Sequence, residues 1–308
     1  MDFNRLGQVV MKVLVTGGSG FIGQHVIAYL LERGDEVINA DLKKSPNRDF
    51  IIKHVVGDLR DPEVVEEAFD FGVDAVIHLA ALTSVIKSID NPLEVFQTNV
   101  AATHLLLEQA RTRGVHHFVM ASTNAVVGDV GNSVIDESLP MRPLTPYGAT
   151  KAAGEMLLSA YGSSYEMVTV ALRLTNVFGA GMQVKDSIVA RMMRYAMNNG
   201  TLQIYGDGKQ VRDYVYVTDV ARAFVEALSW AGTDVVTIGS ASSISVNDLH
   251  SLVCEVTGVN FEKEHVPAKA CEMPAVIVDT AKAGTKGFIP AFSLRDGIAA
   301  TWDDFRRQ

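Results

Sequence analysis

Short apolar runs alternate with amphipathic stretches along the first 175 residues. Apolar runs rich in β-branched side chains predict buried strands, and the stretches between them have helical spacing. The strands are expected at residues 9–15, 36–40, 51–56, 75–79, 117–121 and 168–174. The helices are expected up to Leu31 with Gly34 closing the first, and at residues 62–69, 92–113 and 149–161.

Strands that are separated by helices in this order predict right-handed crossovers and a parallel sheet. The fold class is therefore α/β, a Rossmann-type doubly wound parallel sheet with a smaller mixed α/β lobe at its C-terminal end. After residue 175, glycine, asparagine and proline interrupt the pattern, and too few elements remain for a second complete sheet. We divide the chain into residues 1–175 and 176–308 and expect this boundary to be discontinuous.

The composition narrows the class of partner. Of the 308 residues, 48% are hydrophobic and 20% charged, as in ordinary globular proteins. The 27 Lys and Arg against 36 Asp and Glu give a net charge of −9, which argues against nucleic acid or an anionic membrane as partner. No apolar run approaches the roughly 18–20 residues that span a bilayer, and residues 1–8 lack a signal-peptide stretch. We expect a cytoplasmic protein.

The cysteines and histidines predict neither a disulfide framework nor a metal site. Cys254 and Cys271 have no partner at a zinc-binding spacing, and two thiols cannot cross-link so long a chain. His116 and His117 precede a predicted strand and likewise lack a ligand at a suitable spacing.

A glycine-rich segment links the first predicted strand to the first predicted helix. Gly17 allows the tight turn, Gly20 lets the backbone approach a pyrophosphate, and Gly23 allows close packing of the helix. Asp41 ends the second predicted strand, where a carboxylate accepts hydrogen bonds from both ribose hydroxyls and repels a 2′-phosphate. This favours NAD over NADP. Two alternatives stay open: Lys43 and Lys44 could accommodate a phosphate, and Asp41 could be a solvated strand end.

Tyr147 and Lys151 are four residues apart at the start of a predicted helix, so their side chains share one face. Free tyrosine is a poor base at neutral pH. A nearby ammonium and the positive nicotinamide of NAD⁺ would favour the phenolate and make Tyr147 an acid/base group. A surface pair with no catalytic role is the alternative.

The glycine motif together with this pair resembles the extended, sugar-nucleotide-modifying branch of the short-chain dehydrogenase/reductase superfamily. The resemblance covers nearly the whole chain. It includes Thr16-Gly-Gly-Ser-Gly-Phe-Ile-Gly23, Gly57-Asp58-Leu59, His78-Leu79-Ala80-Ala81, Asn99, Ser122-Thr123, Tyr147 to Lys151, Arg173-Leu-Thr-Asn176-Val-Phe-Gly179 and Gly206 to Asp219.

The resemblance implies a role for each matching residue. Asp58 and Leu59 would border the adenine, and Lys151 would also hold the nicotinamide ribose. Thr123 would hydrogen-bond the reacting sugar hydroxyl, beside Tyr147. The residues expected to contact or support NAD are Gly17, Gly20, Phe21, Ile22, Gly23, Asp41, Asp58, Leu59, Leu79, Ala80, Ala81, Asn99, Tyr147 and Lys151.

The substrate implied by the resemblance is a nucleoside-diphosphate sugar. Asn176 and Arg212 match positions that hold its diphosphate, and a guanidinium suits phosphate oxygens. Local hydrogen bonding is the alternative role for Asn99, and a salt bridge to Asp213 or Asp219 is the alternative for Arg212. Homodimerisation is also expected, through the helices at residues 92–113 and 149–161.

The reaction implied by the resemblance begins with Tyr147 taking a proton from the sugar C4 hydroxyl. Dehydratases of this branch carry an acid directly after the catalytic Thr, whereas this chain has Asn124 and Ala125. This favours 4-epimerisation, most of all of a UDP-hexose, over 4,6-dehydration. A 4-keto-sugar-nucleotide reductase is the main alternative, and a non-catalytic NAD-binding protein is a third.

Two departures from the family pattern bear on the sugar-nucleotide site. Val127 stands where the family usually has tyrosine, which changes the packing near the sugar. The family often places a second arginine in the C-terminal lobe, and Lys269 occupies that region here.

Overall fold

The computed structural model describes residues 10–268 and 274–307. Its main feature is a seven-stranded sheet in the order β11-β7-β5-β4-β1-β2-β3, with every pairing parallel. The strand order reverses between β1 and β4, which is where doubly wound sheets bind ligands. The strands are β1 Lys12–Thr16, β2 Glu36–Asp41, β3 Lys53–Val56, β4 Ala75–His78, β5 His117–Thr123, β7 Val168–Leu174 and β11 Asp234–Ile238.

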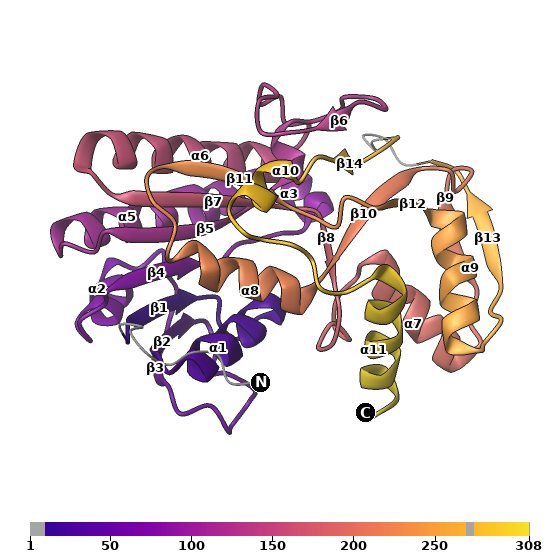
Figure 1. Ribbon diagram of the computed structural model, residues 1–308, viewed down its shortest axis with the longest axis horizontal. Coiled ribbons are helices and arrows are strands. Elements are labelled where there is room, and N and C mark those ends of the chain that lie inside the picture. The colour runs from indigo at the N-terminus through magenta and orange to yellow at the C-terminus, as the bar shows by residue number, and fades with distance from the viewer. Residues whose placement is uncertain (1–9, 269–273, 308) are drawn as a thin grey trace.

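Helices cover both faces of this sheet, with α5 and α6 on one side and α1 and α8 on the other (Figure 1). Val26 of α1 and Phe224 of α8 belong to one apolar core, and Leu106 of α5 and Leu158 of α6 belong to another. Two buried faces explain why the strands are apolar without alternation. The helices around the sheet are α1 Phe21–Arg33, α2 Pro62–Phe69, α3 Val85–Asp90, α4 Pro92–Phe96, α5 Ala102–Thr112, α6 Pro146–Tyr165, α8 Val217–Ala227 and α10 Ala281–Thr285.

These elements confirm the predicted α/β class and correct two boundaries. The expected helix at 92–113 is interrupted by a π-helical turn, Gln97–Ala101, which joins α4 to α5. The expected helix at 149–161 begins earlier, because Thr145 caps it by accepting a hydrogen bond from the Gly148 amide. Tyr147 therefore lies in the first turn of α6.

The smaller lobe packs against one end of the sheet, at the right of Figure 1. It contains β8, β10 and β12 in one sheet, and β13 paired with β9 in another. The chain leaves this lobe to add α8 and β11 to the larger layer, so residues on both sides of position 175 build the main sheet. The functional division at that position stays a prediction. The lobe's elements are β8 Asn176–Phe178, α7 Ile188–Asn198, β9 Leu202–Tyr205, β10 Val211–Tyr216, β12 Ser243–Ser245, α9 Val246–Thr257, β13 Lys263–Val266 and α11 Leu294–Arg306.

A short ladder of β6 Val134–Ile135 and β14 Ile277–Val278 completes the structure. Val127, at the position where the resembling family has tyrosine, is buried beside this ladder in an apolar cluster with Ile135 and Ala152. Ala152 directly follows Lys151 in α6. Within the part of the chain that the structure describes, none of the helices could cross a membrane.

Candidate active site

The glycine-rich turn after β1 packs closely on the neighbouring backbone. Gly17 has a φ of +70°, and a Cβ there would lie 2.7 Å from the Ala80 amide nitrogen. A Cβ on Gly23 would lie 2.4 Å from the Gly17 oxygen, so this glycine packs α1 against the turn itself. Gly20 caps α1 with extended backbone, and Phe21 and Ile22 follow in the first turn. First-turn amides have no partner within the helix and can bind phosphate.

Asp41 lies beside this turn at the end of β2. Its Oδ2 accepts a hydrogen bond from the Ser19 amide at 3.0 Å, and its Oδ1 accepts one from the Lys43 amide at 3.3 Å. The carboxylate is therefore fixed at the edge of the glycine turn, as a ribose-binding group would be.

The segments after β3 and β4 reach the same edge of the sheet. Asp58 pairs with Arg60, and hydrogen bonding to that guanidinium holds the pKa of the Asp58 carboxyl below its usual value. Leu59 is buried. After β4, the Leu79 amide donates to the Thr16 carbonyl, and the Ala80 and Ala81 side chains are half-buried.

A buried hydrogen-bond chain joins Thr16, at the end of β1, to Thr103 of α5, whose hydroxyl donates to the Asn99 carbonyl in the π-helical turn at 2.7 Å. The Thr16 hydroxyl lies 2.7 Å from His78 Nδ1, and His78 Nε2 lies 2.8 Å from the Thr103 hydroxyl. The Ala80 amide also donates to Thr16 Oγ1 at 3.3 Å. The role of Thr103 was not predictable from the sequence, because a threonine on a helix carries no signal of its own.

Asn99 lies in the π-helical turn and connects two other elements. Its side chain accepts from the Leu82 amide, donates to the Leu82 carbonyl, and donates to Thr150 Oγ1 on α6. The Thr150 hydroxyl in turn donates to the Tyr147 carbonyl at 2.8 Å. The side chain thus bonds outside its own helix, which favours a supporting role over local hydrogen bonding.

Thr123, Tyr147 and Lys151 come together where β5 ends against the start of α6. Thr123 is the last residue of β5, and its hydroxyl hydrogen-bonds Tyr147. Lys151 is buried and donates from Nζ to the Ala121 carbonyl at 2.9 Å. The predicted catalytic residues therefore form one cluster.

Burial dominates the protonation of this cluster in the protein without NAD, whereas the expected phenolate depends on Lys151 and the positive nicotinamide together. Burial raises the pKa of Tyr147 to about 12, and the hydrogen bond with Thr123 opposes this only in part. Burial also lowers the pKa of Lys151 to about 8, against the opposing charge of Glu155. Desolvation outweighs charge attraction here because both side chains leave water. The protein alone thus keeps Tyr147 as the neutral phenol.

Behind Lys151 lies a buried ion pair that sequence analysis missed. Glu155 and Arg173 are each 2% exposed, and Arg173 Nη2 lies 2.8 Å from Glu155 Oε2. A signal was available, since Glu155 follows Lys151 by four residues on the same helix and the apolar strand β7 carries an arginine.

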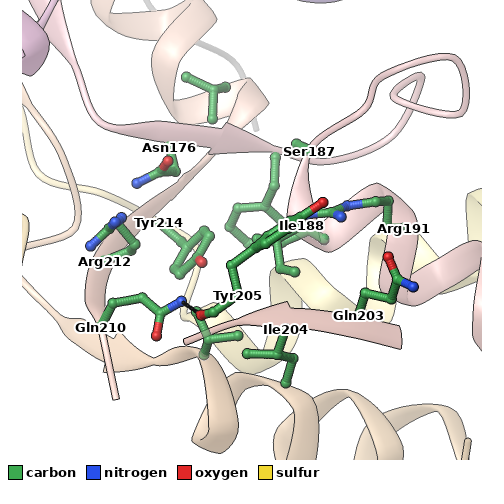
Figure 2. Close-up of a pocket in the computed structure, with 14 residues that line it drawn as sticks. Asn176, Ser187, Ile188, Arg191, Gln203, Ile204, Tyr205, Gln210, Arg212 and Tyr214 are labelled. Carbon is green, nitrogen blue, oxygen red and sulfur yellow. Dashed lines mark hydrogen bonds between the residues drawn. The ribbon is translucent and has the colours of Figure 1, made fainter. Parts of the chain in front are cut away.

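A pocket of about 220 Å³ opens in the smaller lobe between β8, β9, β10 and α7. Figure 2 shows Asn176 and Arg212 side by side on one wall, with Tyr214 next to them and Ile188 and Ile204 on other walls. The structure therefore brings together the two residues expected to bind substrate. Lys269 lies outside the described residues.

Several polar groups in this lobe hydrogen-bond other parts of the protein. Asn176 Nδ2 donates to the Asp213 carbonyl at 2.9 Å, and Arg212 Nη1 donates to the Val211 carbonyl at 2.8 Å. The Asp213 carboxylate accepts from the Thr175 hydroxyl and from the Ser240 amide and hydroxyl. On the wall that α7 forms, Ser187 Oγ and Arg191 Nε are buried and have no hydrogen-bond partner among the described residues.

The family model described as the NAD dependent epimerase/dehydratase family matches residues 13–239. The chain belongs to this family. The expectation drawn from the sequence motifs is thereby confirmed, and with it the expected class of cofactor.

Several members of the epimerase/dehydratase family are similar over nearly their whole length. The UDP-glucose 4-epimerase of Corynebacterium glutamicum is 31% identical over 314 residues, covering 95% of each chain. The solved structure of the Thermus thermophilus UDP-glucose 4-epimerase with NAD has a TM-score of 0.89 and 36% identity, covering 96% of this chain and 99% of that one. The Thermotoga maritima UDP-glucose 4-epimerase with UDP-glucose gives 0.92 and 33% with the same coverage.

Proposed function

We propose that this member of the epimerase/dehydratase family catalyses NAD-dependent 4-epimerisation of a nucleoside-diphosphate sugar, with a UDP-hexose as the favoured substrate. The observation that carries the proposal is the residue pair after Thr123. Asn124 is buried in a short 3₁₀ turn and the Ala125 amide donates to Thr123 Oγ1, so no carboxyl group follows the threonine. The cluster offers one acid/base group, Tyr147, which is what 4-epimerisation requires.

The residues around the glycine turn fit NAD. Gly17 lets the turn pack directly on Ala80, Gly23 packs α1 on the turn, and Asp41 is held beside it. When bound, NAD would supply a hydride acceptor and donor for the sugar C4, and the 4-keto sugar would have to turn over between the two transfers. Lys43 and Lys44 are exposed, and the Lys43 backbone amide donates a hydrogen bond to Asp41. The charged group fixed at this edge of the glycine turn is therefore the Asp41 carboxylate.

The chain's own groups would handle the proton. Tyr147 Oη takes the proton of the C4 hydroxyl and later returns it, while the Thr123 hydroxyl orients that oxygen. With a pKa of about 12 in the free protein, Tyr147 needs neighbouring positive charge to act as a base. Lys151, with a pKa of about 8, is charged at neutral pH. The positive nicotinamide of bound NAD⁺ would add the further charge that favours the phenolate.

The lobe pocket would receive the nucleotide end of the substrate. Arg212 would bind the diphosphate and Asn176 would assist, while Tyr214 and Ile204 offer flat and apolar surface to a base. The related structure with UDP-glucose supports uridine as the favoured nucleoside.

A homodimer is also proposed, because exposed apolar side chains gather on α3, α4 and α6. Ile86 is 58% exposed, Leu93 68%, Phe96 52% and Met156 60%. An exposed apolar patch of this kind marks an association surface. A cytoplasmic location stays a prediction.

The test is to incubate the purified protein with UDP-glucose, UDP-N-acetylglucosamine and UDP-glucuronate separately. The expected product is the C4 epimer of at least one of them, resolved by chromatography and proton NMR. Denaturing the protein should release NAD at near one molecule per chain. A 4-keto-6-deoxy product would instead indicate dehydration, and stoichiometric NADPH consumption with a keto-sugar would indicate a reductase.

Tyr147→Phe is the matched variant for this assay. It keeps the ring and removes the hydroxyl, so it should keep the fold and the bound NAD while the rate falls by about 10²–10⁴-fold. Unaltered turnover in this variant would overturn the assignment of Tyr147.

A further inference from the structure

Three consecutive residues of β5 bind three successive turns of α6. Thr123 hydrogen-bonds Tyr147, and the Ala121 carbonyl accepts from Lys151 Nζ at 2.9 Å. Between them, the Ser122 hydroxyl donates to Glu155 Oε1. Because Tyr147, Lys151 and Glu155 are spaced four residues apart, they form one stripe along the helix. Glu155 therefore belongs to the same strand–helix seam as the two catalytic residues.

Glu155 is fixed from the other side by Arg173. Arg173 Nε lies 3.0 Å and 3.2 Å from the two carboxylate oxygens, and Nη2 lies 2.8 Å from Oε2. Ser122 and Arg173 are direct partners in the β5–β7 register. Among the described residues, Arg173 Nη1 has no hydrogen-bond partner, and the carboxylate that hydrogen-bonds this guanidinium is Glu155.

We propose that Glu155 and Arg173 are positioning residues of the Tyr147/Lys151 centre, with the Glu155 carboxylate holding α6 on β5 one helical turn from the Lys151 ammonium. Their effect on turnover rests on the proposed function. Their effect on Lys151 is a property of the free protein and can be measured without substrate.

The charges around Lys151 show why Glu155 is the group to test. Tyr147 and Glu155 face it from α6, His78 from β4, and Arg173 lies behind Glu155 on β7. Tyr147 is a neutral phenol, and burial together with the Lys151 charge lowers the pKa of His78 to about 3, so His78 is neutral as well. Glu155 is thus the negative charge that opposes the desolvation of Lys151. Removing the Glu155 charge should therefore lower the pKa of Lys151 further, because no negative charge would then oppose the effect of burial.

The direct test is a pH titration of Lys151 by NMR, using protein with ¹³C-labelled lysine and Lys151→Met to assign the signal. In Glu155→Gln the titration midpoint should fall by about one pH unit, because the opposing charge is gone. Glu155→Asp keeps the charge with a shorter side chain and should hold the midpoint closer to that of the unmodified protein.

The single Glu155→Gln variant leaves a buried guanidinium uncompensated and can unfold, so a double variant is needed. Glu155→Gln with Arg173→Met removes both charges and should melt at a higher temperature than the single variant. Its Lys151 midpoint should lie below that of the unmodified protein but above that of the single variant, because the Arg173 charge is also gone. Asp219→Asn controls for the loss of a different buried carboxylate, one that accepts from the Ala291 and Phe292 amides and pairs with Arg222. It should lower the melting temperature without moving the Lys151 midpoint.

A folded double variant whose Lys151 midpoint is unchanged would overturn the proposal, whatever the activity assays show. If the midpoint falls and epimerase turnover is present, the pH above which kcat declines should fall by the same amount, about one pH unit. If the midpoint falls and no epimerisation is found with any sugar nucleotide, the positioning of Lys151 stands and the proposed reaction is the part that fails.

Discussion

Asn99 Nδ2 donates a hydrogen bond to Thr150 Oγ1 at 3.1 Å and thereby joins the π-helical turn to the helix that carries Tyr147 and Lys151. The same amide group binds both backbone groups of Leu82, in the segment that follows β4. One side chain therefore links the predicted cofactor edge of the sheet to the catalytic helix. The widened turn between α4 and α5 is what places Asn99 in this position.

Replacing Asn99 by alanine should damage both stability and catalysis. The Leu82 amide and carbonyl would lose their partner, which costs about 1–3 kcal/mol of unfolding free energy. Tyr147 would also lose indirect support through Thr150, so kcat should fall while KM changes little. Urea unfolding and steady-state kinetics measure the two effects. Gln97→Ala, an exposed position in the same turn, is the matched control and should change neither.

Replacing Gly17 by alanine should abolish retention of NAD. The new Cβ would lie 2.7 Å from the Ala80 amide nitrogen, so the turn must move away from β4. Gly34→Ala is the control, because Gly34 also has a positive φ, +96°, but has open space around its Cβ position. Gly34→Ala should cost about 1 kcal/mol of stability and keep the cofactor. Equal NAD content in both variants after gel filtration would contradict this account of the turn.

Acid should destabilise the protein through its buried histidines. Burial is the largest cause that lowers the pKa of His78, from its usual 6.5 to about 3, and burial also lowers the pKa of His25 and His250. Below pH 6.5 these histidines become protonated in the unfolded chain but stay neutral in the folded chain. The unfolding free energy therefore falls as pH drops from 6.5 toward 3. His78 alone contributes a slope of up to about 1.4 kcal/mol per pH unit. Chemical denaturation from pH 7.5 to 4.5 measures this slope.

His78→Gln tests which histidine is responsible. Glutamine offers hydrogen bonds to Thr16 and Thr103 but does not titrate, so the variant should lose less stability between pH 6.5 and 4.5 than the unmodified protein. An identical slope in the two proteins would mean that other groups cause the loss of stability at low pH.

Much of the larger sheet was predictable because its signals are local. Short apolar runs bounded by glycine or proline mark the strands, and Pro62 and Gly34 mark helix ends. The π-helical turn was not predictable, since residues 92–113 keep a helical pattern while the extra residue changes only the geometry. The place of β11 at the edge of the main sheet depends on contacts with β7, which is distant in sequence.

The candidate site likewise has a part that short motifs predict and a part that depends on contacts distant in sequence. The glycine turn, Asp41 and the Tyr147–Lys151 pair are short motifs whose spacing predicts their geometry. The Glu155–Arg173 pair joins a helix to a strand, and the pKa of Tyr147 depends on how deeply it is buried. Residue spacing contains neither quantity, so the raised pKa of Tyr147 in the protein alone was not predictable. The lowering expected from Lys151 together with NAD⁺ stays a prediction.

Arg212 is the residue through which the lobe pocket can be tested. Arg212→Met keeps the length of the side chain and removes its charge, so binding of a sugar-nucleotide diphosphate should weaken. Charged hydrogen bonds contribute about 1.5–3 kcal/mol, which predicts a KM or Kd for the UDP-sugar raised about 10–100-fold with NAD content unchanged.

Lys209→Met is the matched control for Arg212→Met, because Lys209 also carries a positive charge, lies three residues away and is paired with Asp207 at the exposed surface. Isothermal titration of both variants with UDP and with UDP-glucose separates the two positions. A specific pocket requires weakened binding in Arg212→Met alone. Equal weakening in both variants would mean that the surface attracts the ligand only through overall charge, and the assignment of this pocket to the nucleotide would then fall.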